Sequence, residues 1–459
     1  MSHMEVQKTD VSIGRWKSYP ANKDSKIHWL GEVPCNWPIA RMRFYININP
    51  AKSEIKGISS DTLVSFVPME SVGVYGGLCL DQSISIEEVG SGYTYFSEGD
   101  VLVAKITPCF ENGKAAIAER LKNRIGFGST ELHVLRPKNS VDRKFLFYLA
   151  MSHAFRKQGA SYMYGAGGQK RVPDEFIRNF RHPIPSIDEQ QAITAFLDRE
   201  TSRIDTLIAK KQRQIELLQE KRTALISHAV TKGLNPDAKM KDSGIEWLGE
   251  IPEHWGVFKI KHVASLHSGH TPSRQHPEYW EDCTIPWFSL ADVWQIRDGI
   301  REYLDETKEK ISTLGIQKSS AELLPAGTVV VSRTASVGFS GIMSVPMATT
   351  QDFANWVCGQ KIMPEYLLYV FRSMGEEFKR LIMGSTHKTI YMPDVATFVT
   401  PLPPLHEQNL IVQYVQKKKQ DIERLKSAVS LSIAKLEEYR TALISAAVTG
   451  KIDVRKDVA

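Results

Sequence analysis

Apolar residues recur at three, four and seven positions in two long stretches of the chain, and a seven-residue lattice of aliphatic side chains runs through both, interrupted at Lys211. The lattice residues are Leu197, Ile204, Leu218 and Leu225 in the first stretch, and Val415, Ile422, Val429, Leu436 and Leu443 in the second. Such spacing is typical of helices that pair as a coiled coil, so these are the predicted helix-pairing residues. We predict helices over 186–232 and 404–450, each roughly 60 Å long.

The sequence also repeats itself at one constant offset. Trp29–Pro34 (WLGEVP) returns as Trp247–Pro252 (WLGEIP), an offset of 247 − 29 = 218. The same offset relates Lys23–Ser25 to Lys241–Ser243, Glu189–Gln190 to Glu407–Gln408, Trp37 to Trp255, and Arg222–Ser227 to Arg440–Ser445 (both RTALIS). Two large copies are too few for a solenoid and indicate a molecule with pseudo-twofold symmetry.

Three arrangements of the two predicted helices are open: pairing with each other, packing on their own modules, or pairing with another chain. Mutual pairing is favoured because matched lattices of equal length bury one another's apolar seams. Pseudo-twofold symmetry makes such a pair antiparallel. The leading block of the first copy, near residues 15–37, has no counterpart after residue 450, so the last helix is expected to fold back toward the first residues.

Between the matched blocks the two copies diverge, and residues 44–170 share little with 262–388 beyond one strand-like segment. Short β-rich runs alternate with Gly, Asn and Pro turns, which predicts an α+β module in each copy. The predicted segments are 1–27, an N-terminal segment near the last helix; 28–185 and 246–403, the modules; 186–232 and 404–450, the helices; 233–245, a linker; and 451–459, a tail.

A polar loop precedes each predicted helix at matching positions. Glycines in such loops allow close backbone approach, and Lys, Arg, Gln and Thr donate hydrogen bonds to phosphates or base edges. An ordinary solvated loop has the same composition, but the recurrence favours a DNA-binding role. The candidate DNA-binding residues are Lys105, Tyr164, Gln169, Lys170 and Arg171 in the first copy, and Arg333, Thr386, His387, Lys388 and Thr389 in the second.

Trp294 and Arg297 form a candidate second contact surface in the later module, together with Trp287 and Arg301. The competing interpretation is that aromatic residues in a strand-rich domain belong to the core, and it is favoured about two to one. Three histidines near residue 267 stand at no spacing that indicates zinc, so no metal site is predicted.

Composition narrows the class of protein. Lys plus Arg outnumber Asp plus Glu by 58 to 52, which permits a polyanionic partner without requiring one. The 5 cysteines include no Cys-x-x-Cys pair, which favours reduced thiols and a cytoplasmic location. No apolar run is long enough to predict a membrane span.

Motifs for chemistry are missing. Gly113-Lys114 and Gly450-Lys451 are not followed by the Ser or Thr of an ATP-binding loop, and no dinucleotide fingerprint or Gly-x-Ser-x-Gly occurs. The Asn/Asp-Pro-Pro-Tyr/Phe motif of amino-methyltransferases is also absent. We therefore expect a binding subunit with no catalytic residue and no bound cofactor or metal.

The doubled WLGE-x-P blocks, the PPLHEQ entry to the second helix and the doubled RTALIS ends together resemble the DNA specificity subunit of type I restriction-modification systems. The first helix entry departs slightly, reading PSIDEQ. The resemblance covers the whole chain. It implies two pseudo-twofold-related target recognition domains, separated by two long antiparallel coiled-coil helices, in an α+β fold.

By this resemblance each domain reads one half of a split double-stranded DNA site, the helices set the gap, and two modification (methyltransferase) subunits dock on the repeated regions. Restriction (translocase and endonuclease) subunits join them. S-adenosylmethionine, ATP and Mg²⁺ are expected on those partners, and no membrane is involved. Since the two modules differ, the target is expected to be asymmetric. Two alternatives are a stand-alone regulator with two DNA-binding domains, and a nuclease or methyltransferase whose site escapes recognition.

Overall fold

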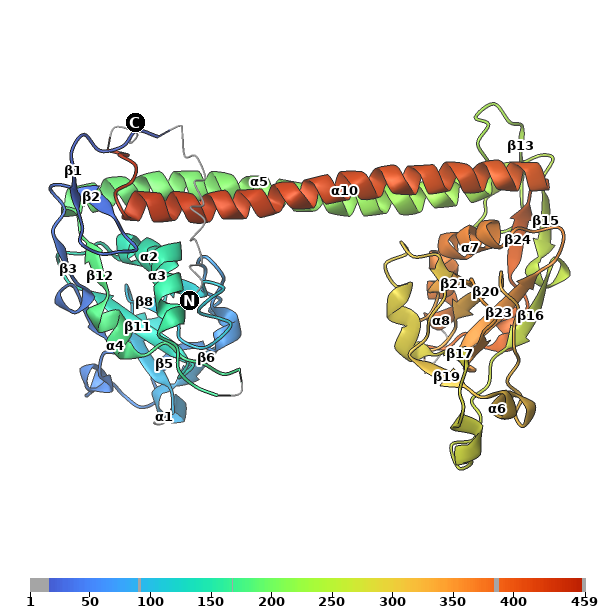
Figure 1. Ribbon diagram of the computed structural model, residues 1–459, viewed down its shortest axis with the longest axis horizontal. Coiled ribbons are helices and arrows are strands. Elements are labelled where there is room, and N and C mark those ends of the chain that lie inside the picture. Colours follow the sequence, from blue (N-terminus) through green and yellow to red (C-terminus); the bar gives the residue numbers. More distant parts are fainter. Residues whose placement is uncertain (1–15, 90–91, 167, 384–387, 456–459) are drawn as a thin grey trace, which may run out of the picture. The chain divides into compact units, whose positions relative to one another are not determined.

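The computed structural model describes residues 16–89, 92–166, 168–383 and 388–455. They form two compact units: residues up to Lys211 together with those from Leu431 onward, and Gln212–Ser430. Each unit holds one α+β module and a part of both long helices, α5 (Ile187–Lys232) and α10 (Leu405–Val448) (Figure 1). The predicted combination of mixed helix and sheet with two long helices is confirmed.

The module of the first unit is built on two four-stranded sheets. Its strands are β4 (Ile46–Ile48), β5 (Leu63–Val67), β6 (Ser83–Ser85), β7 (Thr94–Ser97), β8 (Val101–Ala104), β9 (Ala115–Ile117), β10 (Ile125–Gly128) and β11 (Leu132–Pro137), and its helices are α1 (Ile86–Val89), α2 (Arg143–Met151), α3 (His153–Ser161) and α4 (Asp174–Asn179). The sheet orders are β6-β5-β10-β7 and β4-β11-β8-β9. Helices α2 and α3 lie between these sheets and the long helices (Figure 1).

The module of the second unit has a five-stranded sheet, β16-β23-β20-β21-β18, and a three-stranded sheet, β19-β17-β22. These strands are β16 (Ala264–Ser268), β17 (Ile285–Phe288), β18 (Tyr303–Leu304), β19 (Glu309–Ile311), β20 (Val329–Ser332), β21 (Ser340–Met343), β22 (Ala348–Thr349) and β23 (Phe353–Cys358). The helices are α6 (Thr313–Gln317), α7 (Pro364–Ser373), α8 (Gly375–Met383) and α9 (Met392–Val395). Helix α7 lies next to α10, and α6 lies at the far end of the module (Figure 1).

The two modules share a frame although their sequences diverge. Strands β5 and β10 pair in parallel with Val67 opposite Gly128, and β17 and β22 do the same with Phe288 opposite Thr349. Smaller antiparallel pairs recur as well: β1 (Asn22–Asp24) with β2 (Glu32–Pro34), β3 (Ile39–Arg41) with β12 (Arg181–Pro183), β13 (Met240–Asp242) with β14 (Glu250–Pro252), and β15 (Gly256–Lys259) with β24 (Val399–Leu402). The sequence repeat is thus also a repeat of topology.

The doubled tryptophans anchor the ends of the long helices. Trp37 and Trp255 are fully buried. A Cβ added at Gly450 would meet Pro34 and Trp37, at 2.4 and 3.2 Å, and both Gly450 and Gly233 have positive φ. These glycines therefore end the helices where the chain must turn closely over an indole.

The doubled Glu-Gln pair explains how each long helix begins. The Gln190 amide Nε2 donates to the carbonyls of Ser140 and Pro185, and its Oε1 accepts from the Asp142 N–H at 2.8 Å. Gln408 repeats this pattern with Lys361, Pro403 and the Met363 N–H at 2.9 Å. Because both side chains are fully buried, these bonds tie the helix start to the loop before α2 or α7.

The long helices contact each other within each unit in an antiparallel register. Asp205 of α5 pairs with Arg440 of α10 in the first unit, and Arg222 pairs with Glu423 at 3.1 Å in the second. The offset of 218 residues converts one pair into the other, since 205 + 218 = 423 and 222 + 218 = 440. Packing on their own modules occurs too, because Ile193 and Leu197 lie in the same apolar core as α2.

The segment that follows α10 contacts residues next to β1 and β2. The Asp453 N–H donates to the Lys17 carbonyl at 2.7 Å, and Lys451 Nζ donates to the Leu30 carbonyl at 2.9 Å. The Tyr19 hydroxyl donates to Glu189 at 2.8 Å. In chain order, residues 451–455 follow α10 and residues 16–21 precede β1, as the 233–245 linker follows α5 and includes β13.

His182 provides a pH test of the first module. Its ring is fully buried, stacked against Phe180 with centroids 6.1 Å apart, and burial lowers its pKa to about 3. The unfolded chain binds the proton near its ordinary pKa of about 6.5, so folding opposes protonation. Between pH 7 and pH 5 we expect this residue to remove about 2 kcal/mol of stability.

Chemical unfolding of the wild type and of His182→Leu at both pH values measures the effect. The wild type is expected to lose about 2 kcal/mol more than the variant between pH 7 and pH 5. An equal loss in both proteins would show that His182 is not kept neutral by its burial.

Candidate nucleic-acid interface

In the first unit the predicted loop residues are brought together at the end of β8. Tyr164 and Arg171 exchange backbone hydrogen bonds of 3.2 and 2.9 Å, which closes the loop between them. The Val172 N–H donates to the Lys105 carbonyl, and the Thr107 N–H donates to the Lys170 carbonyl, both at 2.9 Å. These hydrogen bonds attach the 164–171 loop to the residues that directly follow β8.

Sequence explains this loop locally. A Cβ at Gly165 would lie 2.6 Å from the Gln169 carbonyl oxygen, so only glycine permits the close approach, as predicted. Tyr164, Gln169 and Lys170 are exposed, and Lys105 is half-buried. An aromatic ring, an amide and ammonium groups are thus presented together, which is a donor set suited to phosphates and base edges.

Arg171 is engaged within the protein. Its Nε and Nη2 donate to the Glu131 carboxylate at 2.9 Å, and this hydrogen bonding raises the pKa of the guanidinium. The Lys105 N–H also donates to the Glu131 carbonyl, at 2.9 Å. The Arg171 side chain therefore braces the loop, and Lys105 and Lys170 are the better candidates for direct DNA contact.

The second unit repeats this backbone arrangement with different side chains. The Ile390 N–H donates to the Arg333 carbonyl and the Arg333 N–H donates to the Asp352 carbonyl, both at 2.8 Å. Thr334 and Thr389 form an isolated bridge, as Ile106 and Arg171 do. Arg333 therefore occupies the position of Lys105. Lys388 is exposed, whereas Thr386 and His387 lie outside the described residues.

In the second candidate surface, Trp287 lies in the core, whereas Trp294 and Arg297 lie on the exterior. Trp287 is buried and its Nε1 donates to the His270 carbonyl at 3.2 Å, so the core interpretation holds for it. Trp294, in the short helix η7 (Leu290–Gln295), is 67% exposed. Arg297 is also exposed, with its guanidinium 5.8 Å from the Phe339 ring centroid. These last two side chains remain available to a partner.

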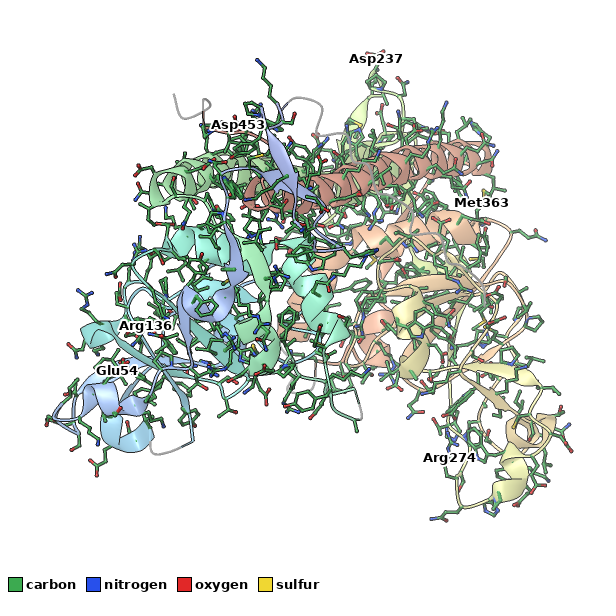
Figure 2. The ribbon with its side chains drawn as sticks, turned by 60° about the vertical axis from the view of Figure 1, so that its left-hand side comes forward. Glu54, Arg136, Asp237, Arg274, Met363 and Asp453 are labelled. Atoms are coloured by element: carbon green, nitrogen blue, oxygen red, sulfur yellow. The ribbon has the colours of Figure 1, made fainter. Side chains whose placement is uncertain are left out.

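Sequence reasoning missed one exposed cation. Arg274 lies at the end of the second module farthest from α10 (Figure 2), with its guanidinium 3.8 Å from the Trp280 ring centroid and 2.5 Å from Glu309. No periodic pattern links residues 274, 280 and 309. In the first module, Arg136 pairs with Glu54 and, at 2.7 Å, with Asp100 (Figure 2).

The predicted helix-pairing residues differ in burial. Buried lattice residues are Leu197, Ile204, Val415, Ile422, Val429 and Leu443. Leu218, Leu225 and Leu436 are half-buried. Leu225 packs beside Val415 and Ile422 in the second unit, and Leu436 packs with the core of the first.

Among the described residues, no group of three or more His, Cys, Asp or Glu side chains gathers as a metal site. Within the same residues, no helix has the length and apolar character needed to cross a membrane.

Comparison with known proteins gives consistent matches. Residues 59–217 and 252–429 match the family model described as the type I restriction modification DNA specificity domain. The EcoAI type I restriction enzyme specificity subunit of Escherichia coli is 35% identical over 229 residues, which are 50% of this chain and 37% of that protein. The MjaVIII specificity subunit of Methanocaldococcus jannaschii is 25% identical over 459 residues, covering 95% of this chain and 97% of that protein.

A chain from a solved structure that concerns complex assembly and conformational transition of the type I R-M system has a TM-score of 0.70. It is 19% identical and covers 92% of this chain and 99% of its own length, a likeness that shows the fold. The chain spans between 33% and 38% of the length of the first three curated relatives that it matches.

Proposed function

The chain belongs to the type I restriction-modification DNA specificity family, and from this premise we propose that it is the subunit that reads the DNA target of such a system. Each module binds one half of a bipartite, asymmetric double-stranded site. The two modification subunits dock on the repeated regions, and restriction subunits complete the assembly. S-adenosylmethionine, ATP and Mg²⁺ are bound by those partner subunits and not by this chain.

One observation carries the proposal: the same backbone arrangement recurs at the ends of β8 and β20 with different side chains, of which Lys170 and Lys388 are exposed and Lys105 and Arg333 are half-buried. The frame holds Lys105 and Lys170 in one module and Arg333 and Lys388 in the other. Phosphate contacts by such cations supply affinity, and contacts with base edges supply specificity. A shared backbone arrangement that carries different side chains therefore suits two modules that recognise two different half-sites.

The test is reconstitution from purified subunits. The chain alone is expected to transfer no methyl group and to cut no DNA, and methylation of adenine is expected once the modification subunit and S-adenosylmethionine are added. Methyl transfer by the chain alone, free of partner, would contradict the proposal. Tight sequence-specific binding that needs no partner and leads to no methylation in its presence would favour the stand-alone regulator.

A further inference from the structure

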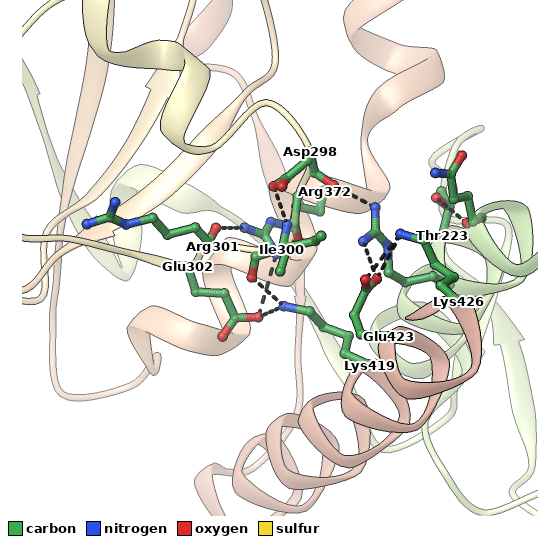
Figure 3. A network of polar contacts seen from close by, with 12 residues as sticks. Thr223, Asp298, Ile300, Arg301, Glu302, Arg372, Lys419, Glu423 and Lys426 are labelled. Carbon is green, nitrogen blue, oxygen red and sulfur yellow. Dashed lines mark hydrogen bonds and ion pairs between the residues drawn. The ribbon is translucent and has the colours of Figure 1, made fainter. Parts of the chain in front are cut away.

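In the second unit, three cations from three helices hold one loop of the recognition module by its backbone (Figure 3). Arg222 of α5 donates to the Asp298 carbonyl at 2.6 Å. Arg372 of α7 donates to the carbonyls of Gly299 and Arg301, both at 2.8 Å, and Lys419 of α10 reaches the Ile300 carbonyl at 3.4 Å. Four successive carbonyls of the 298–301 loop are thus bound.

The cations are largely buried and are balanced by acidic groups. The side chains of Arg222, Arg372 and Lys419 are 10–13% exposed. Glu302 pairs with Lys419, lies 3.5 Å from Arg372 and accepts the Tyr369 hydroxyl at 2.9 Å. Burial lowers the pKa of Lys419 and of Arg372, and the Glu302 carboxylate acts in the opposite direction.

Arg222 connects three parts of this unit. Its Nη1 pairs with Glu423 at 3.1 Å across the two long helices, while its Nη2 holds the 298–301 loop. One guanidinium therefore joins the helix pair to the module. A planar group with divergent donors can do this, whereas a single ammonium cannot satisfy both partners in the same geometry.

Arg440, the residue equivalent to Arg222, also joins the helix pair to the module in the first unit, but its partner in the module is an aromatic ring instead of a backbone carbonyl. It pairs with Asp205 across the helices, and its guanidinium lies 4.0 Å from the Tyr75 ring centroid. The Tyr75 hydroxyl lies 3.0 Å from Thr441 Oγ1 and accepts from Arg156 at 3.2 Å. Tyr75 has a positive φ and belongs to a loop of the module, so Arg440, like Arg222, contacts a loop of its module.

We propose that Arg222 and Arg440, the first residues of the doubled RTALIS blocks, are positioning residues that fix each recognition module on the helix pair, so that a given helix length selects a single gap between half-sites. This inference rests on the proposed function. The 298–301 loop belongs to the module, so the contact that Arg222 makes ties the module itself to the helix pair. A module that can shift along the helices would accept several gaps.

The experiment measures methylation by the chain with its modification subunit on DNA whose half-sites are constant and whose gap is native, one base pair shorter or one longer. In Arg222→Ala and Arg440→Ala, the preference for the native gap is expected to fall about tenfold, the factor expected from one charge-assisted hydrogen bond. Base preference within each half-site stays unchanged. Lys at either position restores part of the preference.

Arg213→Ala is the matched control, because Arg213 lies on α5 and pairs with Glu216 and Glu220 of its own helix. It is expected to behave as wild type. Should Arg440→Ala fail to fold, Tyr75→Leu removes the same contact from a half-buried module residue and is expected to loosen the gap equally.

Three outcomes separate the inference from its premise. Folded variants that discriminate gaps as sharply as the wild type overturn the positioning role alone, and so does a loss of half-site preference in step with gap preference, which indicates a disordered module. A wild-type complex that methylates no two-part site overturns the proposed function itself.

Discussion

Duplicating seven residues in both long helices is expected to lengthen the gap between the two methylated half-sites. Repeating Gln212–Leu218 in α5 and Ser427–Ile433 in α10 keeps the seven-residue lattice and the antiparallel register set by the two interhelical ion pairs. Seven residues add about 10 Å of helix, which is comparable to three base pairs at ~3.4 Å each. The original target should no longer be modified.

The same seven residues inserted after Asp237 provide the control. Asp237 is exposed in the linker between α5 and β13 (Figure 2), so this insertion leaves the helices unchanged and should leave the gap unchanged. Methylation mapping of host DNA gives the gap directly. A helix-extended variant that stays folded and active on the original gap would refute the role of the helices as the spacer.

Alanine substitutions at the two loops are expected to affect one half-site each. Lys105 and Lys170 belong to one module, and Arg333 and Lys388 to the other. A lost bidentate base contact costs about 1–3 kcal/mol at one position, whereas a lost phosphate contact weakens binding to all sequences alike. A DNA library with both halves randomised separates these results for each variant, assayed with the modification subunit present.

Arg171→Ala and Lys239→Ala are informative controls for this series. Arg171→Ala removes the ion pair with Glu131 and is expected to loosen the whole loop, relaxing preference in its own half-site at more than one position. Lys239 is exposed in the linker and should have no effect on base preference. A Lys170 substitution that altered base preference in both halves would contradict the assignment of one reader to each module.

Periodic and repeated features of the fold were predictable from the sequence. The long helices follow from the seven-residue lattice, and their antiparallel pairing follows from the pseudo-twofold symmetry of the repeat. The ion pairs that fix the register, Asp205 with Arg440 and Arg222 with Glu423, come from the structure. The close backbone approach in the candidate loop after β8 was predictable because Gly165 stands among polar residues there.

Contacts made through backbone atoms could not be predicted from the pattern of side chains in the sequence. The 298–301 loop is bound by its carbonyl oxygens, which every residue carries, so no side-chain pattern reveals that Arg222 holds it. The same limit applies to Trp287 and Trp294, since one is buried and the other exposed although both read as aromatic positions in a strand-rich segment. Tertiary packing, rather than local sequence, decides between them.

Mapping adenine methylation by long-read sequencing, in a host that expresses this chain with its modification subunit, tests the central claim most directly. We expect one bipartite motif with two different half-sites, a fixed gap of unspecified bases between them, and loss of the motif when this chain is deleted. A contiguous motif, two identical half-sites, or methylation that persists without this chain would contradict it.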